Sequence, residues 1–211
     1  MAGTFIVFEG GDAVGKSTQA TMLADWLTGQ GHRVVLTFEP GDTRAGARMR
    51  QIVLDPATGD LSPRAEALLY AADKAQHVEE VILPALQRGD VVVCDRFVDS
   101  MLAYQGAGRV LDVDRVESIA RWATADLLPD LTVVLDLDPS AGVSEIVDKD
   151  RLESAGTDFH ARARSSFLAL AARDPDYYLV LPAREDREVI AAAVRERVAP
   201  LLSAGSGTLS L

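Results

Sequence analysis

The stretch TFIVFEGGDAVGKST, residues 4–18, decides the fold of this chain. Its first five residues are β-branched or aromatic and two glycines follow shortly after, which predicts a short strand ending at a turn. Residues 10–17 read GGDAVGKS and match the phosphate-binding pattern G-x-x-x-x-G-K-S. Glycines in such a loop let successive backbone N–H groups point at phosphate oxygens, and the helix that follows adds a partial positive charge. The alternative is a glycine turn that only caps a helix.

This loop indicates a nucleoside triphosphate as the ligand and leaves the reaction open. Lys16 is expected to reach the β- and γ-phosphates, and the Ser17 hydroxyl is expected to ligate Mg²⁺. The residues expected to bind ATP are Gly10, Gly11, Asp12, Ala13, Val14, Gly15, Lys16, Ser17 and Thr18.

Strand and helix patterns alternate along the chain, which predicts an α/β fold. The apolar strand runs lie at residues 4–8, 33–38, 91–95, 131–137 and 177–181. The helical patterns lie at residues 16–30, 63–88, 113–128, 159–173 and 186–202. Strands that are continuously apolar are typical of sheets covered on both faces, and the alternation predicts right-handed parallel crossovers. We therefore expect a five-stranded parallel sheet flanked by helices, with a bend at Pro84 in the second helix.

The composition is that of an acidic globular protein. The chain has 32 Asp and Glu against 21 Lys and Arg, a formal net charge of −11. Such a surface repels nucleic acid and anionic membranes, so neither is expected as a partner. No apolar stretch approaches the roughly 20 residues that span a bilayer, and the N-terminus lacks the basic segment of a signal peptide, so a cytoplasmic location is expected.

Few residues in the sequence could form a metal site of the cysteine and histidine type. The single cysteine, Cys94, excludes a disulfide framework and a multi-cysteine zinc site, and its apolar strand predicts a core position. The three histidines, His32, His77 and His160, lack ligand spacing and are interpreted as surface or internally satisfied residues.

The pair Asp95-Arg96 follows the third predicted strand and is the second feature with chemical meaning. Ligands of open α/β sheets gather outside the carboxyl ends of the strands, so both side chains should face the phosphate loop. Asp95 can hold Mg²⁺ directly or through water, and Arg96 can fork onto a phosphate. The alternative is an ion pair at the surface.

Four segments together resemble one family. They are FEGGDAVGKSTQ (8–19), EPGDTRAGARMRQIVL (39–54), LSPRAEALLYAADKAQHVEEVILPALQRGDVVVCDRF (61–97) and DSMLAYQGAGR (99–109). They look like thymidylate kinases of the bacterial type, which are P-loop nucleoside monophosphate kinases. The resemblance runs from about residue 4 to 138 and resumes weakly after residue 150. It implies a three-layer kinase fold, transfer of a phosphoryl group from ATP·Mg²⁺ to dTMP within dTTP biosynthesis, and a homodimer.

The resemblance also implies the roles of single residues. Tyr70 takes the position that stacks on thymine, although a core-facing aromatic residue is the alternative, and Tyr104 would disfavour a 2′-hydroxyl. Arg109 closes the AYQG-G-R motif. The implied catalytic residues are Asp12, Lys16, Arg96, Lys149 and Arg151, and the metal ligands are Ser17 and Asp95. The implied substrate-binding residues are Asp12, Arg50, Tyr70, Lys74, Arg96, Ser100, Tyr104, Gln105 and Glu153.

The sequence departs from the family pattern at several positions. Phe38 and Lys74 replace arginines, and Asp42 replaces a glycine and brings a negative charge towards a phosphate site. The expected mobile lid, about residues 139–157, has Lys149 as its one basic residue before Arg151. The domain is expected to span residues 1–202, with a disordered tail at 203–211. These departures keep two alternatives open: a kinase for another, modified pyrimidine deoxynucleotide, and a catalytically weakened nucleotide-binding protein.

Overall fold

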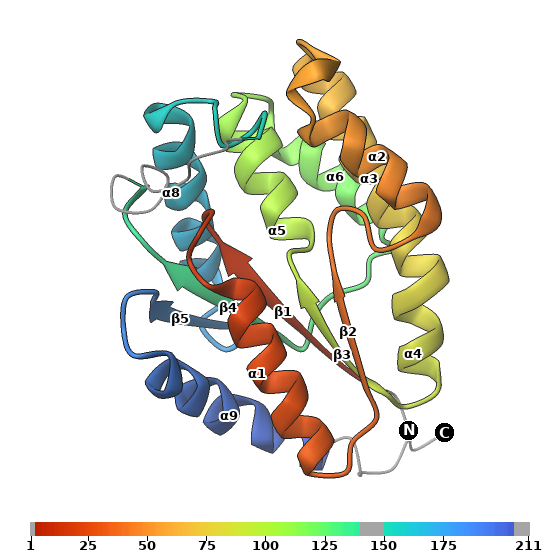
Figure 1. Ribbon diagram of the computed structural model, residues 1–211, viewed down its shortest axis with the longest axis vertical. Helices are drawn as coiled ribbons and strands as arrows, with labels where there is room; N and C mark the ends of the chain where they lie inside the picture. The colour runs from red at the N-terminus through yellow and green to blue at the C-terminus, as the bar shows by residue number, and fades with distance from the viewer. Residues whose placement is uncertain (1–2, 140–149, 205–211) are drawn as a thin grey trace.

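The computed structural model describes residues 3–139 and 150–204, which form one α/β unit (Figure 1). Five strands make a single sheet in the order β2-β3-β1-β4-β5, and each neighbouring pair is parallel. The predicted fold class is thereby confirmed. The strands are β1 (Thr4–Gly10), β2 (Val34–Phe38), β3 (Val91–Asp95), β4 (Leu131–Asp136) and β5 (Tyr178–Pro182).

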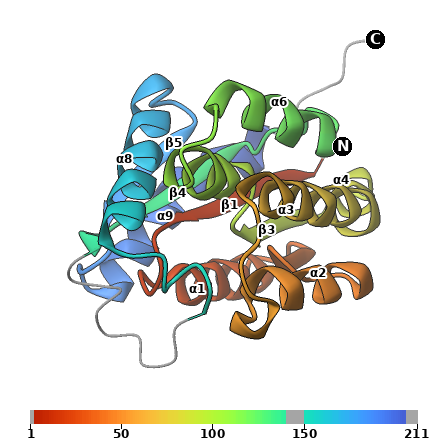
Figure 2. The same cartoon turned by 90° about the horizontal axis from the view of Figure 1, so that it is seen from above.

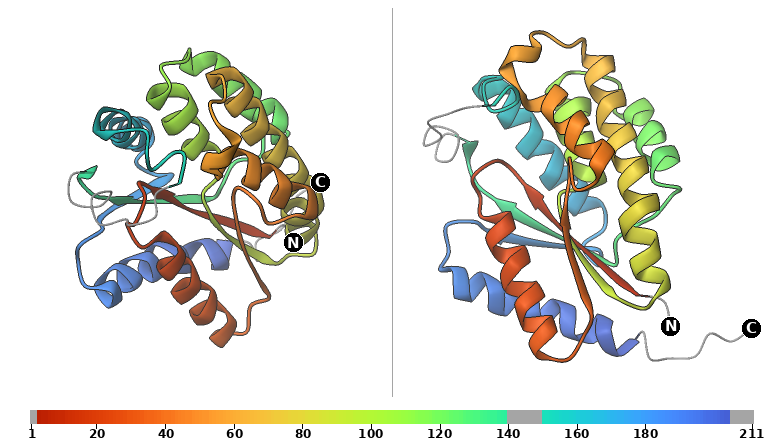
Figure 3. Two further views of the ribbon diagram at one scale, coloured as in Figure 1. Left: turned by 45° about the horizontal axis from the view of Figure 1, so that its top comes forward. Right: turned by 45° about the vertical axis from the view of Figure 1, so that its right-hand side comes forward.

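Helices cover both faces of the sheet, so the unit has three layers (Figures 2 and 3). The helices α1 and α9 lie on one face, where Leu23 and Val194 share a buried cluster with Val93 of the sheet. Helices α3, α6 and α8 cover the opposite face, and α2 packs on α3 (Figure 2). The helical segments are α1 (Lys16–Gly29), α2 (Arg44–Leu54), η1 (Pro56–Thr58), α3 (Pro63–His77), η2 (Val78–Ile82), α4 (Leu83–Gln87), α5 (Val98–Met101), η3 (Leu102–Gly108), α6 (Val113–Ala123), α8 (Thr157–Arg173) and α9 (Arg187–Ala204).

Besides the short 3-10 turn η1, two helical regions are absent from the sequence prediction. The first is α2, which begins at a Thr43 side chain that accepts a hydrogen bond from the Gly46 N–H. A Cβ at Gly46 would lie 2.4 Å from Asp73 Oδ1, so the glycine allows α2 to pack closely on α3. The second is the run of α5 and η3 after β3, in which the wider π-helical hydrogen bonding hides the 3.6-residue period.

Three predicted boundaries are wrong in detail. The helix expected at 63–88 is interrupted by the π-helical turn η2, after which α4 begins. Pro84 lies in the first turn of α4, where a helix does not need the N–H that proline lacks. The helix α6 ends at Ala123 because Ala125 and Asp126 adopt positive φ angles. The helix α9 continues to Ala204, two residues into the predicted tail, and the rest of that tail lies outside the described residues.

The topology fixes where a ligand can bind. Because β1, β2 and β3 are parallel and adjacent, the loops at their carboxyl ends meet at one edge of the sheet. The phosphate loop, the turn that begins at Glu39, and Arg96 follow these three strands in that order. Among the helices of the described residues, none is long and apolar enough to cross a membrane.

Candidate active site

A cleft of about 520 Å³ opens at this edge of the sheet. Its walls come from the phosphate loop, the turn after β2, helices α2 and α3, the segment after β3, and Asp150, Leu152 and Glu153. The structure thus brings most of the expected site residues into one space. Those that line the cleft are Asp12, Ala13, Lys16, Ser17, Arg50, Tyr70, Lys74, Asp95, Arg96, Ser100, Tyr104, Gln105 and Glu153.

The phosphate loop has the backbone that its sequence predicts. Gly10 and Gly15 have φ angles of 128° and 90°, and a Cβ at Gly10 would lie 2.4 Å from the Leu135 carbonyl oxygen. Lys16, the first residue of α1, is buried, and its Nζ donates a hydrogen bond to the Gly11 carbonyl. Burial, reinforced by the nearby positive charge of Arg96, lowers the pKa of Lys16 to about 8. Triphosphate oxygens would therefore stabilise the charged form of this lysine more than a carbonyl does.

Ser17 and Asp95 form the part of the site that can hold a divalent cation. The Ser17 hydroxyl donates a hydrogen bond of 2.5 Å to Asp95 Oδ2. The other carboxylate oxygen, Asp95 Oδ1, is buried and has no hydrogen-bond partner among the described residues. A hydroxyl and an unsatisfied carboxylate oxygen suit Mg²⁺, which keeps several waters and shares phosphate oxygens rather than needing a full protein cage. Among the described residues, no three or more histidine, cysteine or acidic side chains are grouped so that they could hold a metal ion.

Arg96 connects the phosphate loop to the segment after β3. Its Nη2 donates to Asp12 Oδ1 at 2.5 Å, and its Nη1 donates to the Gly10 carbonyl at 3.1 Å and to Ser100 Oγ at 3.0 Å. Arg96 has a φ of 70°, a strained conformation of the kind found at functional sites. Burial disfavours the ionised carboxyl of Asp12, but Arg96 and Lys16 outweigh it and lower the pKa of Asp12. The pair is therefore an ionised carboxylate beside a fixed guanidinium.

Glu9 supports the site from within the sheet and was missed by sequence reasoning. Its fully buried carboxylate accepts from the backbone N–H groups of Phe97 and Ser100, at 2.8 and 3.0 Å, and from Ser100 Oγ at 2.5 Å. Burial raises the pKa of Glu9. Glu9 fixes the turn that carries Arg96, and the available signal was an acidic residue within an otherwise apolar strand.

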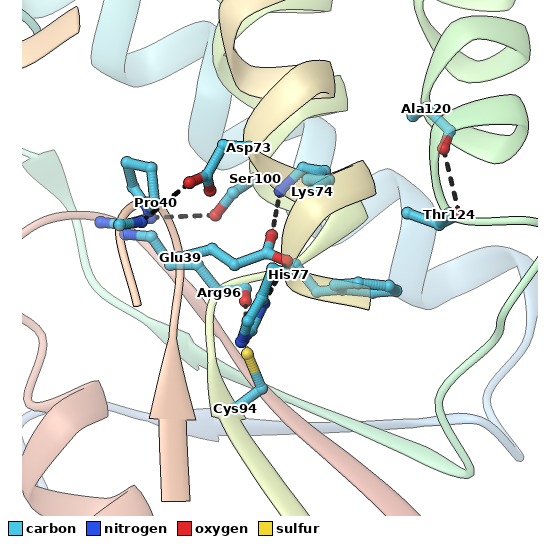
Figure 4. A network of polar contacts seen from close by, with 12 residues as sticks. Glu39, Pro40, Asp73, Lys74, His77, Cys94, Arg96, Ser100, Ala120 and Thr124 are labelled. Carbon is cyan, nitrogen blue, oxygen red and sulfur yellow. Dashed lines mark hydrogen bonds and ion pairs between the residues drawn. The ribbon is translucent and has the colours of Figure 1, made fainter. Parts of the chain in front are cut away.

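A second buried network joins α3 to the turn after β2 (Figure 4). Lys74 Nζ donates to Glu39 Oε2, and His77 Nδ1 lies 2.8 Å from Glu39 Oε1. Burial opposes ionisation of Glu39, but Lys74 and His77 together lower its pKa. The prediction that His77 is an internally satisfied histidine is confirmed. Lys74 and Glu39 both line the cleft, so the ion pair forms part of its wall.

Tyr70 and Tyr104 supply the aromatic surfaces of the cleft. Tyr70 is 7% exposed, and its hydroxyl has no hydrogen-bond partner among the described residues. The Tyr104 hydroxyl donates to Asp12 Oδ2 at 3.1 Å, and its ring lies 5.2 Å from the Arg96 guanidinium carbon. Burial raises the pKa of both tyrosines, so they are neutral at physiological pH. A planar ligand next to Tyr70 would find both an apolar face and a free hydroxyl.

The family model that matches this sequence is that of thymidylate kinase, over residues 8–194. The chain belongs to the thymidylate kinase family. It is 58% identical over 203 residues to the thymidylate kinase of Cutibacterium acnes, which covers 96% of this chain and 100% of that protein. It is 53% identical over 210 residues to the thymidylate kinase of Clavibacter michiganensis, covering 98% and 99%. The crystal structure of thymidylate kinase from Ehrlichia chaffeensis aligns with a TM-score of 0.79 at 28% identity, covering 94% of this chain and 100% of that one.

Asp42, which replaces a glycine of the thymidylate kinase pattern, lines the cleft, and its carboxylate is tied to the end of β2. Its Oδ2 accepts a hydrogen bond of 2.5 Å from Thr37 Oγ1, and the same hydroxyl oxygen lies 2.6 Å from His77 Nε2. The carboxylate is thus tied to the buried network of Glu39 and Lys74. The structure accommodates this extra negative charge within the turn.

Arg151, which the resemblance implies is a catalytic residue, pairs with Glu66 in this structure. Its Nη2 donates to Glu66 Oε2 and its Nε donates to the Val53 carbonyl at 3.0 Å, and Arg151 is not part of the cleft wall. Glu66 is fully buried and also accepts hydrogen bonds from Gln105 and Arg109. The structure therefore places Arg151 in a structural cluster around Glu66. Lys149 and the lid segment 140–149 lie outside the described residues.

Glu153 and His160 lie on the far side of the cleft. Glu153 lines it and accepts a hydrogen bond of 2.8 Å from the Asp150 backbone N–H, and burial raises its pKa. His160 is buried, with Nε2 3.3 Å from the Glu153 carbonyl and Nδ1 3.9 Å from Asp12 Oδ2. Sequence reasoning missed this proximity to Asp12, because a lone histidine on a helix carries no signal of its own.

Proposed function

We propose that this chain transfers the γ-phosphoryl group of ATP to dTMP, giving ADP and dTDP as a step towards dTTP. The observation that carries the proposal is the single cleft in which the phosphate loop faces Arg96 and Tyr70. One end suits a triphosphate and the other suits a planar base, and a guanidinium lies between them. The members of the thymidylate kinase family that this chain resembles over nearly its whole length support the choice of dTMP.

On the ATP side, the phosphate loop would bind the triphosphate through its backbone N–H groups and Lys16. Ser17 and Asp95 would hold Mg²⁺, because they present a hydroxyl and an unsatisfied carboxylate oxygen at the start of α1. Mg²⁺ bound there would neutralise charge on the phosphate oxygens. Ala13, Val14 and Thr18 would complete the loop around the nucleotide.

On the acceptor side, Arg50 and Arg96 would bind the dianionic monophosphate. Tyr70 would stack on thymine, and the Lys74 ammonium, which already donates to Glu39, has further protons for a base carbonyl. Tyr104 would limit the room at the 2′ position of the sugar. Ser100, Gln105 and Glu153 would line the rest of the nucleoside pocket.

The chemistry needs positioning and charge compensation rather than a covalent catalyst. An oxygen of the dTMP phosphate attacks the γ-phosphorus of ATP, a new P–O bond forms, and the bond to the β-phosphate oxygen breaks as ADP leaves. Arg96 and Lys16 offset the negative charge of the two reactants from opposite sides. Asp12 keeps the Arg96 guanidinium in place through its ion pair.

Product analysis tests this proposal directly. Incubation with ATP, Mg²⁺ and dTMP should give dTDP and ADP in equal amounts by anion-exchange chromatography. Lys16→Ala should reduce this by at least 100-fold, as expected when a group that compensates transition-state charge is lost. Formation of ADP without dTDP would contradict the proposal.

We further infer a homodimer that uses helices on one side of the sheet. Leu68 of α3 is 57% exposed and Trp122 of α6 is 84% exposed, although large apolar side chains favour burial. Trp122→Glu should shift the species seen by analytical ultracentrifugation from dimer to monomer, whereas a monomeric wild type would contradict the inference.

The remaining expectations complete the proposal. They are a single kinase domain over residues 1–202, a lid at about 139–157, and a cytoplasmic location.

A further inference from the structure

Phe38 lies at the carboxyl end of β2, the edge strand of the sheet, where the family pattern has an arginine. Its ring is 41% exposed and lines the cleft. This exposed ring has a cationic partner. The partner is Arg50 of α2, whose guanidinium carbon lies 5.7 Å from the centre of the Phe38 ring.

Three residues at the end of β2 and in the turn after it contact the Arg50 side chain. Phe38 faces its guanidinium, and the Pro40 carbonyl accepts a hydrogen bond of 2.7 Å from Nη1. Gly41 lies under the aliphatic stem, where a Cβ would come within 2.7 Å of Arg50 Cδ. The turn after β2 therefore fits one conformation of this arginine.

The charge of Arg50 is positioned but not neutralised. Among the described residues no carboxylate lies within 4.0 Å of its guanidinium nitrogens. The acidic residue nearest along the turn, Asp42, is held by Thr37 instead. An exposed arginine normally samples many rotamers, and fixing it on an aromatic face reduces the entropy lost when it binds an anion.

We propose that Phe38 is a positioning residue for the acceptor phosphate: its ring holds the Arg50 guanidinium in the orientation that binds the monophosphate of the substrate. The proposal rests on the proposed function and deepens it. It assigns to Phe38 an indirect role, through Arg50, in place of the direct positive charge that an arginine would bring. Phe38 should then matter for ligands that carry a phosphate and not for ligands that lack one.

Binding of dTMP and of thymidine tests the proposal, because the two ligands differ only in the phosphate. Phe38→Leu should weaken dTMP binding about three- to fivefold in calorimetry, the size expected for an exposed cation–π contact, and leave thymidine binding within twofold. Phe38→Tyr keeps an aromatic ring and should restore wild-type dTMP affinity. Val180→Ala, at an exposed residue of the opposite edge strand β5, is the control and should change neither affinity.

A double-mutant cycle with Arg50→Met shows whether the effect passes through Arg50. In the Arg50→Met background, Phe38→Leu should have no further effect on dTMP binding. Equal losses for dTMP and thymidine, or a full effect of Phe38→Leu without Arg50, would overturn the proposal. Thermal unfolding of each variant confirms that the fold is kept.

Measurements on the wild-type protein distinguish a failure of this inference from a failure of the proposed function. If the wild type phosphorylates dTMP and Phe38→Leu binds dTMP as the wild type does, the positioning role fails and the proposed function stands. If the wild type binds neither thymidine nor dTMP, the proposed function itself fails.

Discussion

Asp12 lies between Arg96 and Tyr104 and receives a hydrogen bond from each. The Arg96 Nη2 contact to Oδ1 is 2.5 Å and the Tyr104 hydroxyl contact to Oδ2 is 3.1 Å. These residues are more than 80 positions apart in the chain from Asp12. The carboxylate therefore connects the phosphate loop to the acceptor side of the cleft.

Asp12→Asn should lower kcat with dTMP by about 100-fold, because the amide keeps the size of the side chain but removes the charge that fixes Arg96. Tyr104→Phe, which removes the other hydrogen bond and keeps the charge, should cost about tenfold or less. Steady-state kinetics with a coupled ADP assay measures both. A kcat for Asp12→Asn near that of the wild type would show that the ion pair has no catalytic role.

The lowered pKa of Lys16 predicts a pH effect on ATP binding. Burial first, and then the charge of Arg96, bring this pKa to about 8, so the free enzyme loses the ammonium charge as the pH rises above 8. The affinity for ATP should fall about tenfold between pH 7.5 and 9.5. Lys16→Arg keeps its charge throughout and should bind ATP independently of pH in this range. A wild-type affinity that is flat up to pH 9.5 would contradict the assignment.

The lowered pKa of Lys16 also makes the free energy of unfolding depend on pH. Between about pH 8 and the ordinary lysine pKa of 10.5, the unfolded chain binds more protons at this position than the folded chain. The contribution of Lys16 to the free energy of unfolding therefore increases as the pH rises through this window.

Glu66 should be important for stability rather than chemistry. Its buried carboxylate accepts from Gln105, Arg109 and Arg151, and Glu66→Gln would leave two arginines without their counter-charge. We expect a loss of about 3 kcal/mol in the free energy of unfolding at pH 7.5, measured in urea. Glu79→Gln, at an exposed residue, is the matched control and should change it by less than about 0.5 kcal/mol.

The pH dependence of Glu66 follows from its partners. Burial opposes its ionisation, but Arg109 and Gln105 outweigh this and lower its pKa. The stabilisation is then present above the unfolded value of 4.5 and is lost as the pH falls through the folded pKa. The difference between wild type and Glu66→Gln should shrink as the pH falls below 4.5, and a constant difference would contradict the ion-pair explanation.

Asp73 should destabilise the protein at neutral pH. Burial, and then the negative charge of Glu39, raise its pKa to about 6. Its Oδ1 accepts from the Gly41 N–H, but its Oδ2 has no partner among the described residues. Because the folded pKa is raised, the free energy of unfolding should fall as the pH rises from about 4 to 6.

Asp73→Asn keeps the acceptor for Gly41 and removes this charge. The variant should be more stable than the wild type by about 1 kcal/mol at pH 7.5 and show no such gain at pH 4. Urea unfolding at the two pH values measures the difference. A gain of equal size at both would show that ionisation is not the cause.

The sequence predicted the features that depend on residues close together in the chain. The phosphate loop is a pattern of eight residues, and Arg96 could be placed because it directly follows a buried strand. The alternation of strand and helix patterns predicted the parallel sheet, but it did not predict the order of the strands. Each of these features is a local sequence pattern whose place in the fold follows from the rules for parallel sheets: right-handed crossovers, and ligand binding at the carboxyl ends of the strands.

The features that were missed depend on contacts between distant segments. Glu66 meets Arg151 across 85 positions, and Glu9 meets Ser100 across 91, so neither pairing has a local signal. Helix α2 contains Gly46, which looks unfavourable for a helix until its close approach to Asp73 is known. The ion pair of Arg151 with Glu66 had no local signal either, and the catalytic role that the resemblance implies for Arg151 stays a prediction.

The acceptor preference is the most direct test of the account. Initial rates with ATP and Mg²⁺ should be measured against dTMP, dUMP, dCMP, dGMP and UMP, and compared as kcat/KM. We expect dTMP to be preferred over each of the others by at least tenfold, with UMP among the poorest because Tyr104 is proposed to limit the room at the 2′ position. Turnover of another pyrimidine deoxynucleotide in preference to dTMP, or no turnover with any of the five, would contradict the central claim.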